Sequence, residues 1–101
     1  MKIVLTTYPN KPKELKKFIL QILWKRLAKC INRINYMKSY YFFEWKINTD
    51  EEKLVIIKTT DDKIESLKNF IENNHPYKIP EIVIINPEDV NNSYLNWINE
   101  K

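Results

Sequence analysis

The chain has 101 residues, 44% of them hydrophobic and 30% charged, with a formal net charge of +4. This length predicts one domain over residues 1–101, and the composition is that of a folded globular protein rather than a disordered one. No apolar run approaches the roughly 20 residues that span a bilayer, so we expect no membrane association. The single cysteine, Cys30, cannot form an internal disulfide, which favours a cytoplasmic location. Glycine is absent, which excludes the glycine-rich loops that cradle nucleotide phosphates.

The first half of the chain predicts a strand, a helix and a long hairpin. Residues 2–8 are apolar and β-branched, as in a buried strand. Residues 11–29 repeat apolar side chains every three or four positions and predict a helix. Residues 30–45 are rich in β-branched and aromatic residues and predict a long strand with a bulge near residues 35–36. Residues 48–51 then predict the turn into the returning strand, 53–60.

The second half predicts a helix, a fixed corner, a strand and a last helix. Thr60 and Asp61 are suitable caps for a helix that ends at residues 73–74. Two prolines within residues 76–80 impose an extended corner before a strand over residues 81–85. A short terminal helix is expected from residue 86 onwards. Without glycine, we expect left-handed backbone positions to fall on Asn or Asp.

This order of elements predicts a ferredoxin-like α+β sandwich (βαββαβ) with an extended hairpin and a short C-terminal helix. Right-handed crossovers place both main helices on one face of a four-stranded antiparallel sheet. The other face is then left open, yet residues 3–5, 54–57 and 82–85 are apolar at consecutive positions, so both faces of the sheet require burial. The sequence therefore predicts self-association over the open face.

Six segments of the chain resemble the CutA family of divalent-cation tolerance proteins, in the same order and spacing. They are TTYP (6–9), KRLAKCIN (25–32), YFFEWKI (41–47), IIKTT (56–60), HPYKIPEI (75–82) and YLNWI (94–98). The chain departs from the family pattern in having Phe42 and Phe43 in place of two tryptophans, and Trp45 in place of a glycine. The resemblance implies a homotrimer, a role in tolerance to divalent cations, copper above all, and a signalling role like that of the PII trimers.

A metal site is the first candidate for a functional site. Copper favours thiolate and imidazole, so Cys30 and His75, with Glu81, form a chemically reasonable set for Cu²⁺ or another divalent cation. One protomer offers too few ligands for a closed site, so a trimer would have to complete it. The alternatives are that Cys30 is a small buried strand residue and that His75 is a loop histidine bonded to the backbone.

The resemblance also implies an inter-subunit cleft that holds a small ligand. Its lining is Tyr41, Glu52, Lys58, His75 and Tyr77. The alternative for the charged pair in this group is a structural ion pair at the contact between subunits.

The aromatic side chains of the hairpin are expected to pack at the trimer interface. They are Phe42, Phe43 and Trp45, joined by Trp97 from the last helix. Residues 40–43 alternate across a strand, so two rings should face each way.

Three classes of function remain to be compared. The first is a non-enzymatic trimer that binds a metal ion or small ligand. The second is an RNA-binding module, since RNA-recognition domains share this order of elements. Those domains need aromatic residues in the middle of the two central strands, and residues 2–8 and 53–60 have none there, so a nucleic-acid partner is not expected. The third, an enzyme, is not supported, because no nucleophile with a base and no paired carboxylates can be identified.

Overall fold

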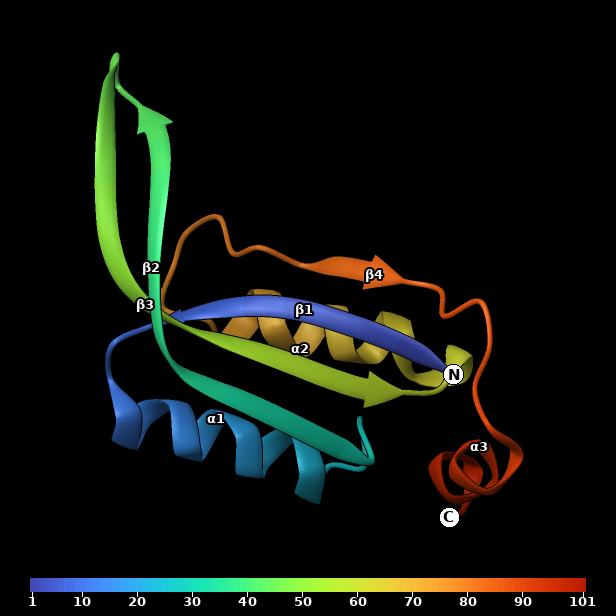
Figure 1. Cartoon of the computed structure of the whole chain (residues 1–101). Coiled ribbons are helices and arrows are strands. Elements are labelled where there is room, and N and C mark those ends of the chain that lie inside the picture. Colours follow the sequence, from blue (N-terminus) through green and yellow to red (C-terminus); the bar gives the residue numbers. More distant parts are fainter.

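The sheet and two of the helices take the predicted arrangement in the computed structural model, which describes residues 1–101. Four antiparallel strands lie in the order β2-β3-β1-β4, with α1 and α2 on one face and the β2–β3 hairpin projecting beyond them (Figure 1). This confirms the ferredoxin-like fold. The elements are β1 (Lys2–Pro9), α1 (Pro12–Trp24), β2 (Cys30–Phe43), β3 (Lys46–Thr59), a 3-10 turn (Asp61–Lys63), α2 (Ile64–Asn74), β4 (Val83–Ile85) and α3 (Asn92–Asn99).

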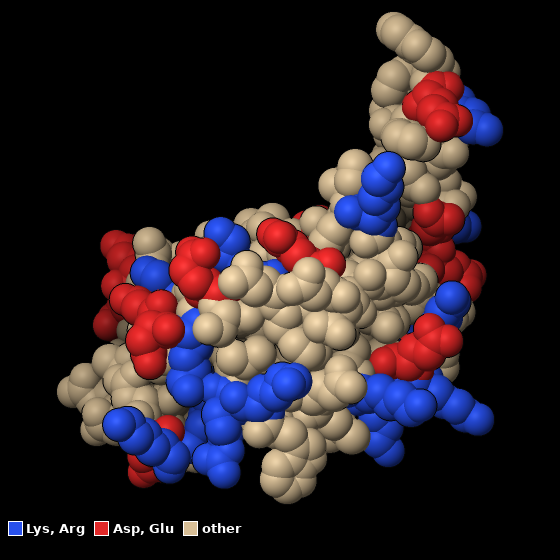
Figure 2. Space-filling model, turned by 180° about the vertical axis from the view of Figure 1, so that it is seen from behind, with Lys and Arg blue, Asp and Glu red and all other residues tan.

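The core lies between the two helices and one face of the sheet. Alternate residues of β1 and β3 face the helices and are buried, because successive side chains of a strand point to opposite faces. The apolar core residues are Val4, Tyr8, Leu15, Phe18, Ile22, Ala28, Val55, Ile57, Leu67 and Ile71. The lysines of α1 face outward and contribute to the basic surface seen from behind (Figure 2). No helix is long and apolar enough to span a bilayer.

The second face of the sheet carries apolar side chains that no element of the chain covers fully. Ile3, Leu5, Leu54 and Ile56 lie there, half-buried by their neighbours in the sheet. At the two edges, Ile34 is 47% exposed and Val83 is 45% exposed. We call these six side chains the open face. Apolar side chains therefore lie on both faces of the sheet, as the sequence predicted.

Helix α1 is shorter than its apolar pattern predicted, and ends at Trp24 instead of residue 29. Arg26 takes a left-handed conformation, with φ 60°. Its N–H donates to Leu23 O at 3.0 Å, and the N–H of Leu27 donates to Ile22 O at 3.0 Å. These two bonds form a Schellman motif, in which glycine is the usual residue at the left-handed position. Arg26 occupies that position, so it lies outside the helix, although it falls within the range 11–29 in which a helix was predicted.

The hairpin turns at Glu44–Trp45, so the predicted turn at residues 48–51 is wrong. Both turn residues are left-handed, with φ 54° and 63°. A two-residue loop needs this geometry to match the twist of its strands. The expectation that Asn or Asp would fill left-handed positions is also wrong, since Arg26, Glu44 and Trp45 fill them. The predicted bulge is confirmed by a register shift between Ile34 and Met37.

The C-terminal part of the chain follows the predicted order with different boundaries. Strand β4 covers only Val83–Ile85, and α3 begins at Asn92 instead of residue 86. Residues 86–91 carry no helical repeat of apolar side chains and form neither helix nor strand. The first helical bond of α3 joins the N–H of Leu95 to Asn91 O at 3.0 Å. A helix that begins here buries Ile98.

We expect Glu44→Asn to stabilise the folded protein. A left-handed conformation is unfavourable for most side chains, whereas asparagine tolerates it, so the gain should be about 0.5–1 kcal/mol per chain. Urea unfolding at fixed protein concentration measures it. Lys46→Asn is the matched control, because Lys46 is exposed, lies next to the turn and does not have positive φ. A Glu44→Asn variant no more stable than this control would contradict the assignment of turn strain.

Candidate functional site: the hairpin base

His75 lies where the chain leaves α2 and meets the base of the hairpin. Its N–H donates to Ile71 O at 2.9 Å, which completes the last turn of α2. Its own backbone is extended, because Pro76 disfavours helix at the residue before it. The side chain is only 8% exposed and packs against the rings of Tyr8, Phe18 and Tyr77. The proline-bounded corner predicted from HPYKIPEI therefore holds the imidazole inside the protomer.

Both ring nitrogens of His75 have partners within the chain. Nδ1 accepts the backbone N–H of Tyr77 at 3.0 Å, so it carries no hydrogen. Nε2, 2.6 Å from Thr7 O, must then carry the hydrogen and donate it to that carbonyl. Thr7 belongs to β1, so the imidazole ties the corner to the sheet. The alternative interpretation of His75, a loop histidine bonded to the backbone, describes this geometry.

Burial lowers the pKa of His75 below its usual value, although the bond to Thr7 and the charge of Glu52 oppose the shift. The folded protein therefore holds a neutral imidazole that becomes easier to protonate on unfolding.

We expect the free energy of unfolding to fall on acidification through the unfolded histidine pKa of about 6.5. Below that pH the unfolded chain binds a proton that the folded chain does not, so stability is present above it and is lost as pH falls. His75 is the only histidine, so His75→Gln should lack this component. Urea unfolding of both proteins at about pH 7.5 and pH 5.5 tests the prediction. An equal change with pH in both would show that His75 does not cause it.

Two tyrosine–carboxylate pairs surround the corner. Tyr77 donates its phenol hydrogen to Glu52 at 2.7 Å, and Tyr41 donates to Asp50. Burial and the bond to Glu52 raise the pKa of Tyr77, and the bond to Asp50 raises that of Tyr41. Both phenols are therefore neutral donors at pH 7. Of the five predicted cleft residues, Tyr77, Glu52 and His75 form one connected group here, and Tyr41 lies near it on the hairpin.

Lys58, the fifth predicted cleft residue, lies at the other end of β3. Its Nζ is 5.6 Å from the centroid of the Tyr94 ring on α3, and its strand partners are Ile3 and Cys30. It forms no ion pair with Glu52 within this chain. Lys58 can meet the hairpin base only if it comes from another copy.

The predicted metal ligands do not meet within one protomer. Cys30 pairs with Lys58 at the far end of the sheet, and Glu81 is exposed between the corner and β4. The structure holds no group of three His, Cys, Asp or Glu side chains that could bind a metal ion. In addition, the Nδ1 of His75 would have to release the Tyr77 N–H before it could bind a metal. A metal site from these residues does not fit the single chain.

The structural role of the buried Lys53 was not predicted from the sequence. Its side chain is only 5% exposed, and Nζ donates to Asn35 O at 3.1 Å, at the bulge of β2. The signal was present, because Lys53 has the same strand parity as the buried Val55 and Ile57. The bond satisfies a carbonyl that the bulge takes out of the regular ladder, so Lys53 fixes the base of the hairpin.

The hairpin aromatics have the predicted two-sided arrangement. Phe42 faces the same side as Ile47, and Phe43 lies on the other side opposite Lys46. Phe42 is 63% exposed and Trp45 is 91% exposed, with their rings 6.0 Å apart in an edge-to-face contact. On α3, Trp97 is 41% exposed beside Tyr94 and Lys29. The predicted interface residues are therefore available at the surface of the single chain.

Comparison with known proteins gives a consistent result along the whole chain. The family model described as CutA1 divalent ion tolerance protein matches residues 2–101. The divalent-cation tolerance protein CutA of Pyrococcus horikoshii is 39% identical over 101 residues, covering 100% of this chain and 97% of its own length. The crystal structure of CutA1 from Ehrlichia chaffeensis superposes with a TM-score of 0.91 at 30% identity, covering 97% of this chain and 91% of that one.

Other relatives are longer. Protein CutA 1 of Oryza sativa, a chloroplastic protein, is 34% identical over 95% of this chain, which spans only 54% of its length. The part shared by all of these proteins is the domain described above. The chain belongs to the CutA family of divalent-cation tolerance proteins.

Proposed function

We propose that the protein is a non-enzymatic homotrimer that serves tolerance to divalent cations in the cytoplasm, with a ligand held in clefts between subunits. The observation that carries the trimer is the open face, an apolar layer that two helices on the opposite side cannot cover. We propose that a second copy of this chain covers the open face, because an apolar surface is best covered by another apolar surface, and each copy carries one.

The hairpin supports the same assembly. Strand β2 is at the edge of the sheet, and its backbone groups on one side have no partner in the chain. Unpaired edges with exposed apolar residues readily pair with another chain. Pairing between subunits would cover the edge and bury aromatic rings on both sides of the hairpin.

The hairpin base supplies the proposed cleft. Glu52, Tyr77 and Tyr41 present a carboxylate and two phenol groups beside the buried His75, near the point where the hairpin leaves the sheet. We propose that a neighbouring subunit completes this cleft with its Lys58, whose charge complements Glu52. A ligand held there would contact two subunits at once, which is the basis for a PII-like signalling role.

The metal hypothesis requires the assembled trimer. Cys30, His75 and Glu81 would have to come together from different subunits, and His75 would have to exchange a hydrogen bond for the metal. Calorimetric titration of Cu²⁺ into the native protein and into Cys30→Ser, His75→Gln and Glu81→Gln separates these roles. Weaker binding in all three variants supports the set. Isotherms identical to the native protein would remove the substituted residue from it, and would leave the trimer and the cleft to be tested by mass and cross-linking.

No feature of the structure supports an RNA-binding role. The open face presents Ile3, Leu5, Leu54 and Ile56 on the two central strands, where bases would need aromatic rings for stacking.

A further inference from the structure

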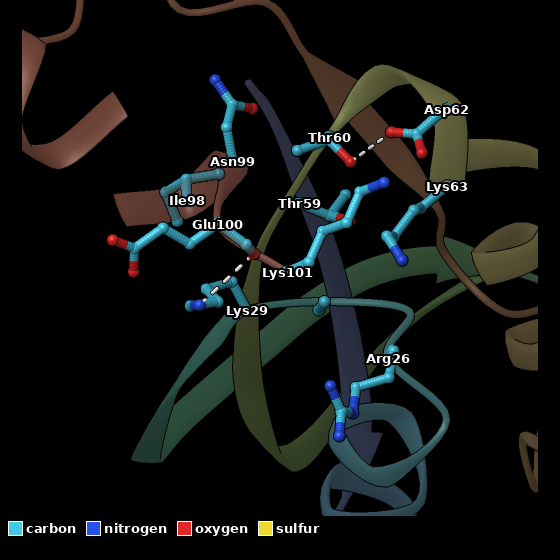
Figure 3. A pocket seen from close by; sticks show the side chains of 11 residues that line it. Arg26, Lys29, Thr59, Thr60, Asp62, Lys63, Ile98, Asn99, Glu100 and Lys101 are labelled. Carbon is cyan, nitrogen blue, oxygen red and sulfur yellow. Dashed lines mark hydrogen bonds between the residues drawn. The ribbon is translucent and has the colours of Figure 1, made fainter. Parts of the chain in front are cut away.

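A pocket of about 350 Å³ lies at the end of β3 opposite the hairpin (Figure 3). It forms where the loop after α1, the start of the 3-10 turn and the end of α3 come together. Its lining is Arg26, Ala28, Lys29, Thr59, Thr60, Asp62, Lys63, Ile98, Asn99, Glu100 and Lys101. None of these residues belongs to the hairpin base.

Positive charge dominates this pocket. Four of its side chains are cationic, Arg26, Lys29, Lys63 and Lys101, and two are acidic. None of the four forms an ion pair in the structure, although exposed pairs occur elsewhere, as between Lys11 and Glu14. Lys29 donates to the backbone oxygen of Glu100 at 3.4 Å and lies over the ring of Trp97. With four cationic and two acidic side chains, the lining keeps a net positive charge, although Lys63 and Lys101 lie close enough to Asp62 to lower the pKa of its carboxyl group.

The two acids offset only part of the positive charge of the pocket. Asp62 accepts a hydrogen bond from Thr60, and this bond lowers the pKa of its carboxyl group. It lies at the first turn before α2, where the backbone N–H groups also favour a negative charge. The carboxylate of Glu100 points away from Lys63 and Lys101 in Figure 3. The space between the cations remains available to an external anion.

The wall that carries Arg26 is held by backbone and side-chain bonds. The Schellman motif fixes Arg26 in its left-handed conformation. Thr59 donates its hydroxyl hydrogen to Leu27 O at 2.7 Å, which ties the same loop to the end of β3. These bonds fix the backbone of Arg26 at the edge of the pocket.

The size and floor of the pocket indicate the class of ligand. An inorganic phosphate ion alone would leave most of this volume empty, and pockets for small organic molecules begin at about 300 Å³. Ala28 and Ile98, which are 8% and 3% exposed, supply an apolar floor. We propose that the pocket binds a small organic phosphate, with the phosphate held by Arg26 and Lys63 and the organic part on Ala28 and Ile98.

Phenyl phosphate is a suitable probe, because it joins a dianion to an apolar ring. We expect a titration followed by ¹H–¹⁵N NMR on the full-length protein to shift the amides of residues 26–29 and 60–64, with phenol giving no such shifts. Lys63→Gln should weaken binding about tenfold, the loss of one charge-assisted hydrogen bond. Lys16→Gln is the matched control, since Lys16 is exposed on α1 outside the pocket and its substitution removes the same charge.

Three results would overturn the proposal. The first is no change of these amides at millimolar phenyl phosphate. The second is equal weakening by Lys16→Gln and Lys63→Gln, which would show non-specific attraction to a basic protein. The third is an unchanged affinity in both Lys63→Gln and Arg26→Gln while their thermal unfolding remains native-like.

Discussion

We expect Phe42→Asp to dissociate the proposed trimer into single chains at micromolar concentration. In the assembly this ring would be packed against a neighbour, and an uncompensated buried carboxylate costs several kcal/mol per copy. A loss of about 4 kcal/mol weakens an association roughly a thousandfold. Phe43→Asp, on the other side of the hairpin, should act in the same direction if both sides are covered. Sedimentation velocity of each variant measures the change.

The control for this experiment is Asn69→Asp. Asn69 is exposed on α2, on the side of the sheet away from the open face, so it adds the same charge outside the proposed contacts. It should sediment as the native protein does. Intact trimers for both phenylalanine variants would show that the hairpin rings are not in a packed interface.

His75→Ala should lower the free energy of unfolding by about 2–4 kcal/mol. It removes the ring that packs against Tyr8 and Phe18, and it leaves Thr7 O and the Tyr77 N–H without their partner. The effect arises from structure, so it should appear without any metal ion. Urea unfolding in the presence of a chelator, at fixed protein concentration, is the measurement.

Glu81→Ala provides the comparison for His75→Ala. Glu81 is exposed and forms no hydrogen bond or ion pair in the structure, so its loss should change stability by less than about 0.5 kcal/mol. If His75→Ala were as mild as Glu81→Ala, the corner would not depend on the imidazole bonds described here.

The sequence predicted the fold well because each element has a physical signal of its own. Apolar residues at three- and four-residue spacing marked α1, and the prolines marked the corner after α2. The ends of the elements were harder to predict from the sequence where the backbone conformation of a few residues determines them. The turn at Glu44–Trp45 uses two residues that rarely adopt positive φ, so residue preference pointed to residues 48–51 instead.

The candidate site could be predicted only in part. His75, Tyr77 and Glu52 lie together within one chain, since the corner and the hairpin base meet at the end of β1, whereas the cleft between subunits stays a prediction. Lys58 and Glu52 do not meet because both lie on β3 with several residues between them, although their opposite charges suggested a pair. Lys53 was missed because its side chain reaches a carbonyl that only the bulge makes available. Likewise, the pocket at the other end of β3 joins segments that are distant in sequence.

The mass of the protein in solution tests the central claim most directly. Light scattering coupled to size-exclusion chromatography, at micromolar concentration and neutral pH, should give three times the 12.3 kDa of one chain. A single stable species of 12.3 kDa would contradict the account, because the open face and the hairpin would then remain exposed to water.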